Sequence, residues 1–339
     1  MRCSKRVSRW GGGFPIAASR ATVGYRAPPV LCSMPDLPAH PIGVPGQPWG
    51  AAERARWLAT QVRRRGYGAD VLDPAQSLAG RFVLQTYGEI GGPGERYPLL
   101  VLRSRGWRDD LPVALVTGGV HGYETSGVHG ALAFAAGEAA RFDGAANLLV
   151  VPCVSPWAYE RIHRWNADAA DPNRAFRTGT AVPEAAALMQ LVAPLSDRVL
   201  VHVDLHETTD SDETEFRPAL AARDGQPFQP GHIPDGFYVV GDAANPQLPF
   251  QRAIVAEVAQ VTHIALPDAR GEIIGSPVVA EGVILYPFRE LGLCAGLTEA
   301  RYTTTTEVYP DSARATPARC IAAQVAAVRA ALTHALANR

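Results

Sequence analysis

The stretch PVALVTGGVHGYETSGVHGALAFAAGEAARF, residues 112–142, decides the fold class of this 339-residue chain. It begins with an apolar run (112–120), passes through a glycine-containing turn, and ends in a segment of helical composition (127–142). Two further apolar strands are expected at 147–154 and 198–206. Apolar strands separated by helices are typical of a sheet that is covered on both faces. The pattern therefore predicts an α/β protein.

Working outward, residues 51–65 form an expected helix with a glycine stop at Gly66, and residues 316–337 an alanine-rich helix. Segments 82–90 and 97–106 flank a glycine-rich turn and predict a hairpin. The first 35 residues hold six Lys or Arg and no acid. We expect residues 1–33 to be a disordered extension, or to precede a true start at Met34, and residues 34–339 to form one catalytic domain.

Composition limits the possible partners. With 47% hydrophobic residues and a net charge of -1, the chain has a large core and no general attraction to nucleic acid or anionic membranes. Its five cysteines form no CxxC pair, and no apolar run suggests a membrane span, so we expect reduced thiols. These features favour the cytoplasm, although export stays open, and the oligomeric state is unknown.

Two strand ends carry residues that bind metal ions in other proteins. His121 and Glu124 follow the strand at 112–120, three positions apart, and His206 closes the strand at 198–206. Side chains at the carboxyl ends of neighbouring strands converge, and two imidazoles with one carboxylate suit zinc. Asp204 and Glu207 could orient His206. The alternative is a turn histidine, a glutamate at a helix N-terminus and a histidine that caps the sheet.

Two more segments could serve a substrate. Residues 159–176 contain Arg161, Arg164, Asn173 and Arg174 in a polar loop, where arginine and asparagine can grip a carboxylate, although surface arginines are usually only solvated. Residues 293–302 are an apolar stretch that contains Glu299, which would be a rigid general base if it ended a buried strand.

The motifs HGYE, DPNR and DLHE, in this order, resemble the zinc carboxypeptidase family, the carboxypeptidase A-like metallopeptidases, from about Pro112 to the C-terminus. The resemblance implies a single α/β domain with a mixed, largely parallel eight-stranded sheet and helices on both faces. It also implies one Zn²⁺ per chain and hydrolysis of the C-terminal peptide bond of peptides by a metal-activated water with a glutamate general base.

Carried over position by position, the resemblance assigns a role to each candidate residue. His121, Glu124 and His206 would bind zinc, Asn173 and Arg174 the substrate carboxylate, Arg164 the developing oxyanion, with Arg161 as its competitor, and Glu299 would be the base. Tyr123 replaces an arginine of well-known carboxypeptidases, and Tyr286 is a guess for the family's substrate-covering tyrosine.

A related branch, the aspartoacylase and succinylglutamate desuccinylase group, shares the HGxE, NR and DLH signature and deacylates N-acyl amino acids. Its members continue into a long β-rich region after the catalytic glutamate, whereas this chain ends in an expected helix. We therefore expect a metallocarboxypeptidase, with the zinc-dependent N-acyl amino acid deacylase as the alternative. A protein that binds peptides without cutting them is a third reading, and substrate side-chain specificity stays open.

Overall fold

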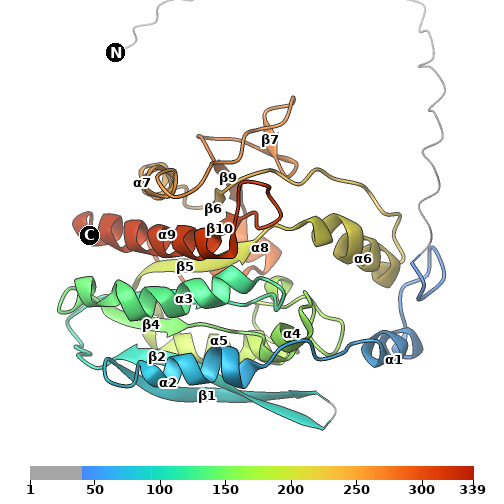
Figure 1. Cartoon of the computed structure of the whole chain (residues 1–339), viewed down its shortest axis with the longest axis horizontal. Helices are drawn as coiled ribbons and strands as arrows, with labels where there is room; N and C mark the ends of the chain where they lie inside the picture. Colours follow the sequence, from blue (N-terminus) through green and yellow to red (C-terminus); the bar gives the residue numbers. More distant parts are fainter. Residues whose placement is uncertain (1–39, 93) are drawn as a thin grey trace, which may run out of the picture. The chain divides into compact units, whose positions relative to one another are not determined.

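The computed structural model of the protein describes residues 40–92 and 94–339, so the prediction for residues 1–33 lies outside the described residues. The described part is one α/β domain (Figure 1). Its helices are α1 (Ala51–Ala59), α2 (Asp73–Ser77), α3 (Thr125–Gly137), α4 (Pro156–Arg161), α5 (Pro183–Val192), α6 (Arg217–Asp224), α7 (Leu248–Val258), α8 (Phe288–Leu291) and α9 (Pro317–Ala337). Its strands are β1 (Phe82–Gly92), β2 (Glu95–Ser104), β3 (Val113–Gly118), β4 (Asn147–Val151), β5 (Val199–Glu207), β6 (Tyr238–Asp242), β7 (Glu272–Ile273), β8 (Ser276–Pro277), β9 (Val283–Tyr286) and β10 (Tyr302–Val308).

The main sheet has eight strands in the order β1-β2-β4-β3-β5-β10-β6-β9, and this confirms the predicted mixed sheet. Strand pairs β3/β4, β3/β5, β5/β10 and β6/β9 are parallel, whereas β1/β2, β2/β4 and β6/β10 are antiparallel. The central strand β5 therefore has parallel neighbours on both sides. Parallel central strands are buried on both faces, which explains their continuous apolar runs.

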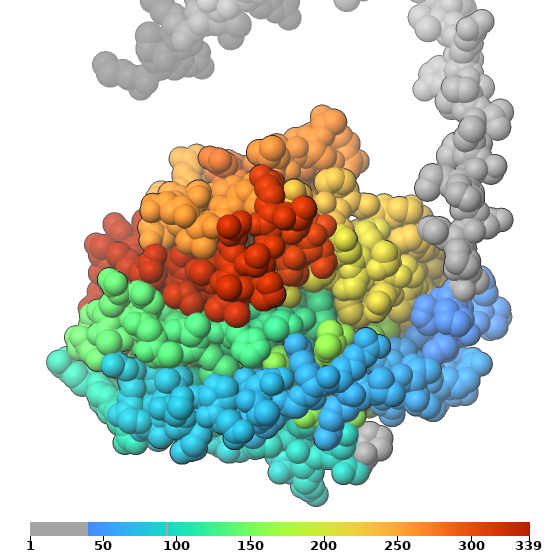
Figure 2. All heavy atoms as spheres, viewed as in Figure 1, coloured from blue at the N-terminus to red at the C-terminus, as the bar shows by residue number. Residues whose placement is uncertain are grey.

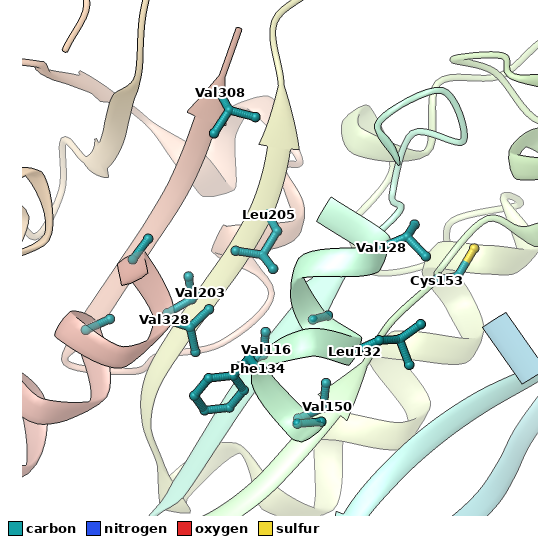
Figure 3. Close-up of a cluster of buried hydrophobic side chains, with 14 of the residues drawn as sticks. Val116, Val128, Leu132, Phe134, Val150, Cys153, Val203, Leu205, Val308 and Val328 are labelled. Atoms are coloured by element: carbon teal, nitrogen blue, oxygen red, sulfur yellow. The ribbon is translucent and has the colours of Figure 1, made fainter. Parts of the chain in front are cut away.

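Helices cover both faces of the sheet. On one face, α3 and α9 pack on β5 and bury side chains such as Val203, Leu205, Phe134 and Val328 (Figure 3). On the other face, α5 places Ala185, Leu188 and Val192 against Val113, Leu115 and Leu149. Because β5 alternates, its residues 202, 204 and 206 point to this second face, where the cavity described below lies.

Helix α9 is long and apolar enough to cross a membrane by length and composition, and half of its apolar window is buried inside the domain. Its Gln324 is fully buried and connects two strands. The Nε2 atom donates a hydrogen bond to the carbonyl of His206 (2.8 Å), and Oε1 accepts one from Thr306 (2.6 Å). Helix α9 is therefore part of the support for the end of β5.

Two expectations for the elements need correction. The helix expected at 51–65 ends at Ala59, because the backbone N–H groups of Arg64 and Arg65 donate to the carbonyl of Glu160 instead of continuing the helix. The stretch 293–302 is no buried strand. It forms the short turn η6 (Cys294–Gly296) and a loop, and the strand β10 begins only at Tyr302.

Glu184, in the first turn of α5, provides a test of the packing on this face. Its side chain is buried beside Asn166, and burial raises its pKa to about 7, against 4.5 for an ordinary glutamate. The folded state therefore holds the proton more tightly than the unfolded state. This contribution favours folding below about pH 4.5 and is lost as the pH rises through 7.

We expect the free energy of unfolding of the parent to fall between pH 4.5 and 8 by on the order of 3 kcal/mol more than that of Glu184→Gln. Urea denaturation of the metal-free protein at the two pH values measures this difference. An exposed control, Glu290→Gln, should follow the parent. Equal pH dependence in the parent and Glu184→Gln would contradict the assignment.

Candidate metal centre and cavity

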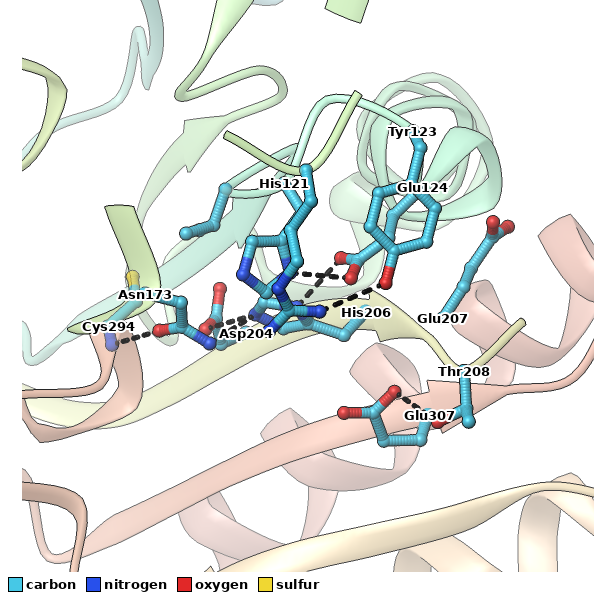
Figure 4. A network of polar contacts seen from close by, with 12 residues as sticks. His121, Tyr123, Glu124, Asn173, Asp204, His206, Glu207, Thr208, Cys294 and Glu307 are labelled. Carbon is cyan, nitrogen blue, oxygen red and sulfur yellow. Dashed lines mark hydrogen bonds and ion pairs between the residues drawn. The ribbon is translucent and has the colours of Figure 1, made fainter. Parts of the chain in front are cut away.

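The structure brings His121, Glu124 and His206 together at the carboxyl ends of β3 and β5 (Figure 4). The Nδ1 atom of His121 lies 2.6 Å from Glu124 Oε1, and the Nδ1 atom of His206 lies 2.7 Å from Glu124 Oε2. All three residues are at least 98% buried. Both imidazoles thus direct their Nδ1 atoms toward the carboxylate of Glu124.

The turn after β3 depends on glycine at two positions. Gly119 has a φ of +61°, a left-handed conformation that glycine adopts without a steric penalty. A Cβ at Gly122 would lie 2.0 Å from the backbone of Ala158 in α4. The space beside Gly122 is filled by the backbone of α4. The turn is therefore fixed by close backbone packing.

Glu124 is available as a ligand because another carboxylate caps the helix that follows it. Glu207 accepts hydrogen bonds from the backbone N–H groups of Thr125 (3.2 Å) and Ser126 (2.7 Å) at the start of α3. An N-terminal carboxylate is favourable at this position. The prediction that Glu207 orients His206 is therefore wrong, since its carboxylate is used by α3.

Two further carboxylates hold the imidazoles from outside. Asp204 Oδ2 lies 2.7 Å from His206 Nε2, as the sequence predicted, and Asp171 Oδ1 lies 3.0 Å from His121 Nε2. These contacts fix both rings with Nδ1 toward Glu124. The sequence analysis gave Asp171 no role, although Asp171 is the first residue of the DPNR motif.

These donors fit a divalent metal ion of the zinc type. Glu124 Oε2 is buried and accepts no well-aligned hydrogen bond from the described residues, although His206 Nδ1 is close. Burial raises the pKa of the Glu124 carboxyl, but His206 and His121 outweigh burial and bring it down to about 2. The carboxylate is therefore ionised, and two imidazole nitrogens with one carboxylate oxygen match a catalytic zinc set.

A second group of metal-type side chains lies deeper, at His202, Asp204 and Cys294. It is already hydrogen-bonded, because Thr117 Oγ1 lies 2.6 Å from Asp204 Oδ1 and 3.0 Å from His202 Nε2. Burial raises the pKa of the Cys294 thiol well above its usual value, which favours the protonated thiol. We interpret this group as support for Asp204.

The metal-type set opens into a cavity of about 710 Å³ that also contains Arg164, Asn173 and Arg174. Arg164 is held by Asp171 (3.0 Å) and Asp212 (3.2 Å). Asn173 Oδ1 accepts a hydrogen bond from the backbone of Cys294 (2.7 Å). The guanidinium of Arg174 donates to the carbonyl of Asn173 (2.7 Å) and forms no ion pair with any carboxylate in the part of the chain that the structure describes.

Two candidates from the sequence do not reach the cavity. The side chain of Glu299 is 78% exposed and forms an ion pair with Arg289 (3.1 Å), because its segment is a surface loop. Arg161 bonds to Glu95 (2.6 Å), and its guanidinium lies over the ring of Trp157. Neither residue lines the cavity, so the expectations for Glu299 as base and Arg161 as oxyanion partner are wrong.

Glu307 occupies the position that we had expected for Glu299. It lies on β10 beside His206 on β5, lines the cavity, and accepts a hydrogen bond from Thr208 Oγ1 (3.0 Å; Figure 4). Burial, opposed by His206 and reinforced by Glu124, raises its pKa to about 8. The sequence signal for this strand is TTTTEV, in which four threonines and a valine, all β-branched, enclose the glutamate; the sequence analysis did not identify it as a strand.

Comparisons with known proteins found a matching family model and similar solved structures. Residues 110–226 match a family model described as the succinylglutamate desuccinylase/aspartoacylase catalytic domain. No curated protein sequence matches the chain.

Solved structures share the fold. A Shewanella amazonensis protein described as a metallopeptidase is 20% identical, with a TM-score of 0.57 over 79% of this chain and 91% of that chain. A metallo-carboxypeptidase from Burkholderia cenocepacia is 16% identical, with a TM-score of 0.52 over 85% of this chain and 69% of that chain. A metallo-carboxypeptidase from Pseudomonas aeruginosa, in complex with (2-guanidinoethylmercapto)succinic acid, is 17% identical, with a TM-score of 0.51 over 85% of this chain and 70% of that chain. The chain thus shares the fold of these metallopeptidases and metallo-carboxypeptidases, and residues 110–226 resemble the succinylglutamate desuccinylase/aspartoacylase catalytic domain.

Proposed function

We propose that the protein is a zinc-dependent metallocarboxypeptidase that hydrolyses the amide bond next to a free carboxylate. One observation carries this proposal. A zinc-type ligand set, a carboxylate with a raised pKa and an arginine without a carboxylate partner among the described residues all face the same cavity. Each supplies one requirement of amide hydrolysis, namely an electrophile, a proton acceptor and a substrate anchor.

His121, Glu124 and His206 would hold one Zn²⁺, and Asp171 and Asp204 keep the two imidazoles oriented toward it. Bound there, the ion would polarise the scissile carbonyl and acidify a water molecule. Proton transfer and substrate binding would be carried out by side chains of the protein.

Glu307, in place of Glu299, is the proposed general base. Its carboxylate is held by Thr208 and by its position on a central strand, so it can accept a proton from the attacking water and return it to the leaving amine. A carboxyl group with a raised pKa keeps the transferred proton more readily than an ordinary glutamate does. The charge of the bound metal would oppose this shift and favour the ionised carboxylate, which is the form that accepts the proton.

Arg174 is the proposed anchor for the substrate carboxylate, and Asn173 fixes the loop beside it. A guanidinium that lines the cavity without a carboxylate partner among the described residues is free to bind an incoming anion. Arg164 is held rigidly by Asp171 and Asp212, and no hydrogen bond of the described residues uses its Nη2 atom. That atom is the proposed donor to the carbonyl oxygen during the reaction.

The second candidate function is deacylation of N-acyl amino acids, which the family-model match over residues 110–226 favours. Both reactions would use the same metal ligands, the same general base and the same carboxylate anchor.

Three described cysteines, Cys153, Cys294 and Cys320, are free and buried, which is consistent with a reducing compartment such as the cytoplasm.

Replacing Glu307 by Gln should lower kcat by roughly 100- to 10,000-fold, because the proton acceptor is lost, and should leave about one zinc per chain. Turnover of a blocked dipeptide and elemental analysis of the purified protein measure the two effects. Glu299→Gln is the matched control and should keep both activity and zinc. If Glu299→Gln is the inactive variant, the assignment of Glu307 fails.

Arg174→Gln should raise KM roughly 10- to 100-fold with a smaller effect on kcat, because a charge-assisted hydrogen bond to the substrate carboxylate is lost. Steady-state kinetics with free and amidated substrates measure this change, and the parent should cleave amidated substrates poorly. Arg161→Gln, which removes an ion pair outside the cavity, should leave KM unchanged. A parent that cleaves both forms equally well would argue against a carboxylate anchor.

A substrate panel separates the two candidate reactions. We expect the zinc-loaded protein to release the last residue of benzyloxycarbonyl dipeptides faster than it deacylates acetyl, succinyl and aspartyl amino acids of matched side chain. The product amine is measured for each substrate. Faster deacylation of the N-acyl amino acids would favour the second candidate, with the same site residues.

A further inference from the structure

Arg65 is the last of three consecutive arginines that follow α1, and its side chain turns into the domain whereas that of Arg64 is exposed. The backbone N–H groups of Arg64 and Arg65 donate to the carbonyl of Glu160 in α4 (2.7 and 3.2 Å). These bonds lead the chain across α4, and Figure 2 shows the blue N-terminal part of the domain lying against its green central part. The side chain of Arg65 is thereby placed between α4 and the start of α3.

The guanidinium of Arg65 donates hydrogen bonds from all three of its nitrogen atoms. Nε donates to the carbonyl of Tyr159 (2.7 Å), Nη1 to the hydroxyl of Thr125 (2.7 Å) and Nη2 to the carbonyl of Gly122 (2.5 Å). The guanidinium carbon also lies 3.5 Å from the centre of the Tyr159 ring. Because the guanidinium is planar and its N–H groups have fixed directions, it holds three acceptors in one arrangement, which a lysine ammonium on a flexible stem does less well.

One of these acceptors lies in the HGYE turn, which carries the first two metal-type residues, and another follows the turn directly. The carbonyl of Gly122 accepts from Arg65 itself. The carbonyl of Tyr123 accepts from the hydroxyl of Thr125 (3.2 Å), which in turn accepts from Arg65. Gly122 and Tyr123 are the two residues between the histidine and the glutamate of the turn. Arg65 therefore holds both peptide carbonyls between the two ligands, one directly and one through a hydroxyl.

The backbone hydrogen bond inside the turn is weak by comparison. It runs from the N–H of Glu124 to the carbonyl of His121 and is 3.4 Å long, beyond the usual range for such bonds. Hydrogen bonds from a cation are stronger than those between neutral groups. Arg65 also donates to Tyr159 of α4, the helix whose backbone closely approaches Gly122. The same guanidinium thus joins the turn to the helix against which the turn packs.

We propose that Arg65 is a positioning residue for the metal ion, which holds the HGYE turn against α4 so that its histidine and glutamate meet His206. This inference rests on the zinc site of the proposed function. Arg65 does not line the cavity and is not one of the metal-type residues, so it acts through the backbone of the turn. It also lies outside residues 110–226, the part of the chain that matches the family model. The affinity of the site for its metal is therefore set in part by a residue that the family model does not cover.

Zinc affinity tests this role without requiring turnover. Arg65→Met keeps an unbranched apolar side chain over Tyr159 but donates no hydrogen bond. We expect its Kd for Zn²⁺, measured on the full chain by competition with a chromophoric chelator, to rise roughly 10- to 100-fold, the range typical of partners that orient metal ligands. Arg64→Met, at the exposed neighbouring position, is the matched control and should bind zinc like the parent. Equal affinity of the parent and Arg65→Met overturns the proposal.

A spectroscopic readout separates positioning from general stabilisation. The visible absorption bands of Co²⁺ bound in place of zinc depend on ligand geometry. The bands of Arg65→Met should therefore differ from those of the parent, whereas those of Arg64→Met should superimpose on them. A lower Tm of metal-free Arg65→Met with unchanged zinc affinity and cobalt spectrum would indicate a merely structural residue and overturn the proposal. Arg65→Lys, which keeps the charge without the planar fork, should recover only part of the affinity, and full recovery would overturn the role of the fork.

Thr125→Val tests the same unit even where Arg65→Met does not fold. The valine keeps the shape of threonine but lacks the hydroxyl that links Arg65 to the carbonyl of Tyr123, so zinc should bind about threefold to tenfold more weakly. Parent-like zinc affinity in both Arg65→Met and Thr125→Val overturns the role of Arg65 alone. A parent that binds neither zinc nor cobalt overturns the proposed function together with this inference, whereas a zinc-binding parent that hydrolyses no amide substrate overturns the proposed function alone.

Discussion

The site depends on the contact of one carboxylate, Glu124, with two imidazoles that reach it from neighbouring parallel strands. Strand β3 delivers His121 and Glu124 through a glycine turn, and β5 delivers His206. Parallel strands end at the same edge of a sheet, so their terminal side chains meet without any long loop. The three donor residues, which lie within a span of 85 positions from His121 to His206, are thereby held as one rigid group.

Three further carboxylates support this contact, each in a different way. Asp171 and Asp204 hold the outer ring nitrogens, and Glu207 caps α3. Asp171 also pairs with Arg164, so the ring of His121 and the proposed carbonyl donor share one support. This sharing ties the metal-type set to the cavity wall, and a change at Asp171 would disturb both at once.

Local patterns were enough to predict the α/β class, the central apolar strands, the hairpin and the three metal-type residues, because apolar runs and glycine turns can be recognised in short stretches of sequence. The eight-stranded mixed sheet was predicted from the resemblance to the carboxypeptidase family. Local patterns did not predict that Glu307 lies on a buried strand and lines the cavity. Strand β10 reads as polar, yet Thr304 and Thr306 are buried because their hydroxyls bond to Gln251 of α7 and Gln324 of α9. Those partners lie far along the chain or beyond the strand, so no short window shows them. Glu299 was chosen instead, in a loop whose apolar residues belong to a turn.

Gln324 of α9 also donates to the carbonyl of His206, 118 residues earlier. During synthesis, the chain up to β5 can leave the ribosome with all three metal-type residues present but without this bond and without β10 beside them. Contacts of such sequence separation form late. An ion that binds to the nascent chain would therefore meet a ligand set whose final support has not yet been made, and the completed geometry requires β10 and α9 to have packed against β5.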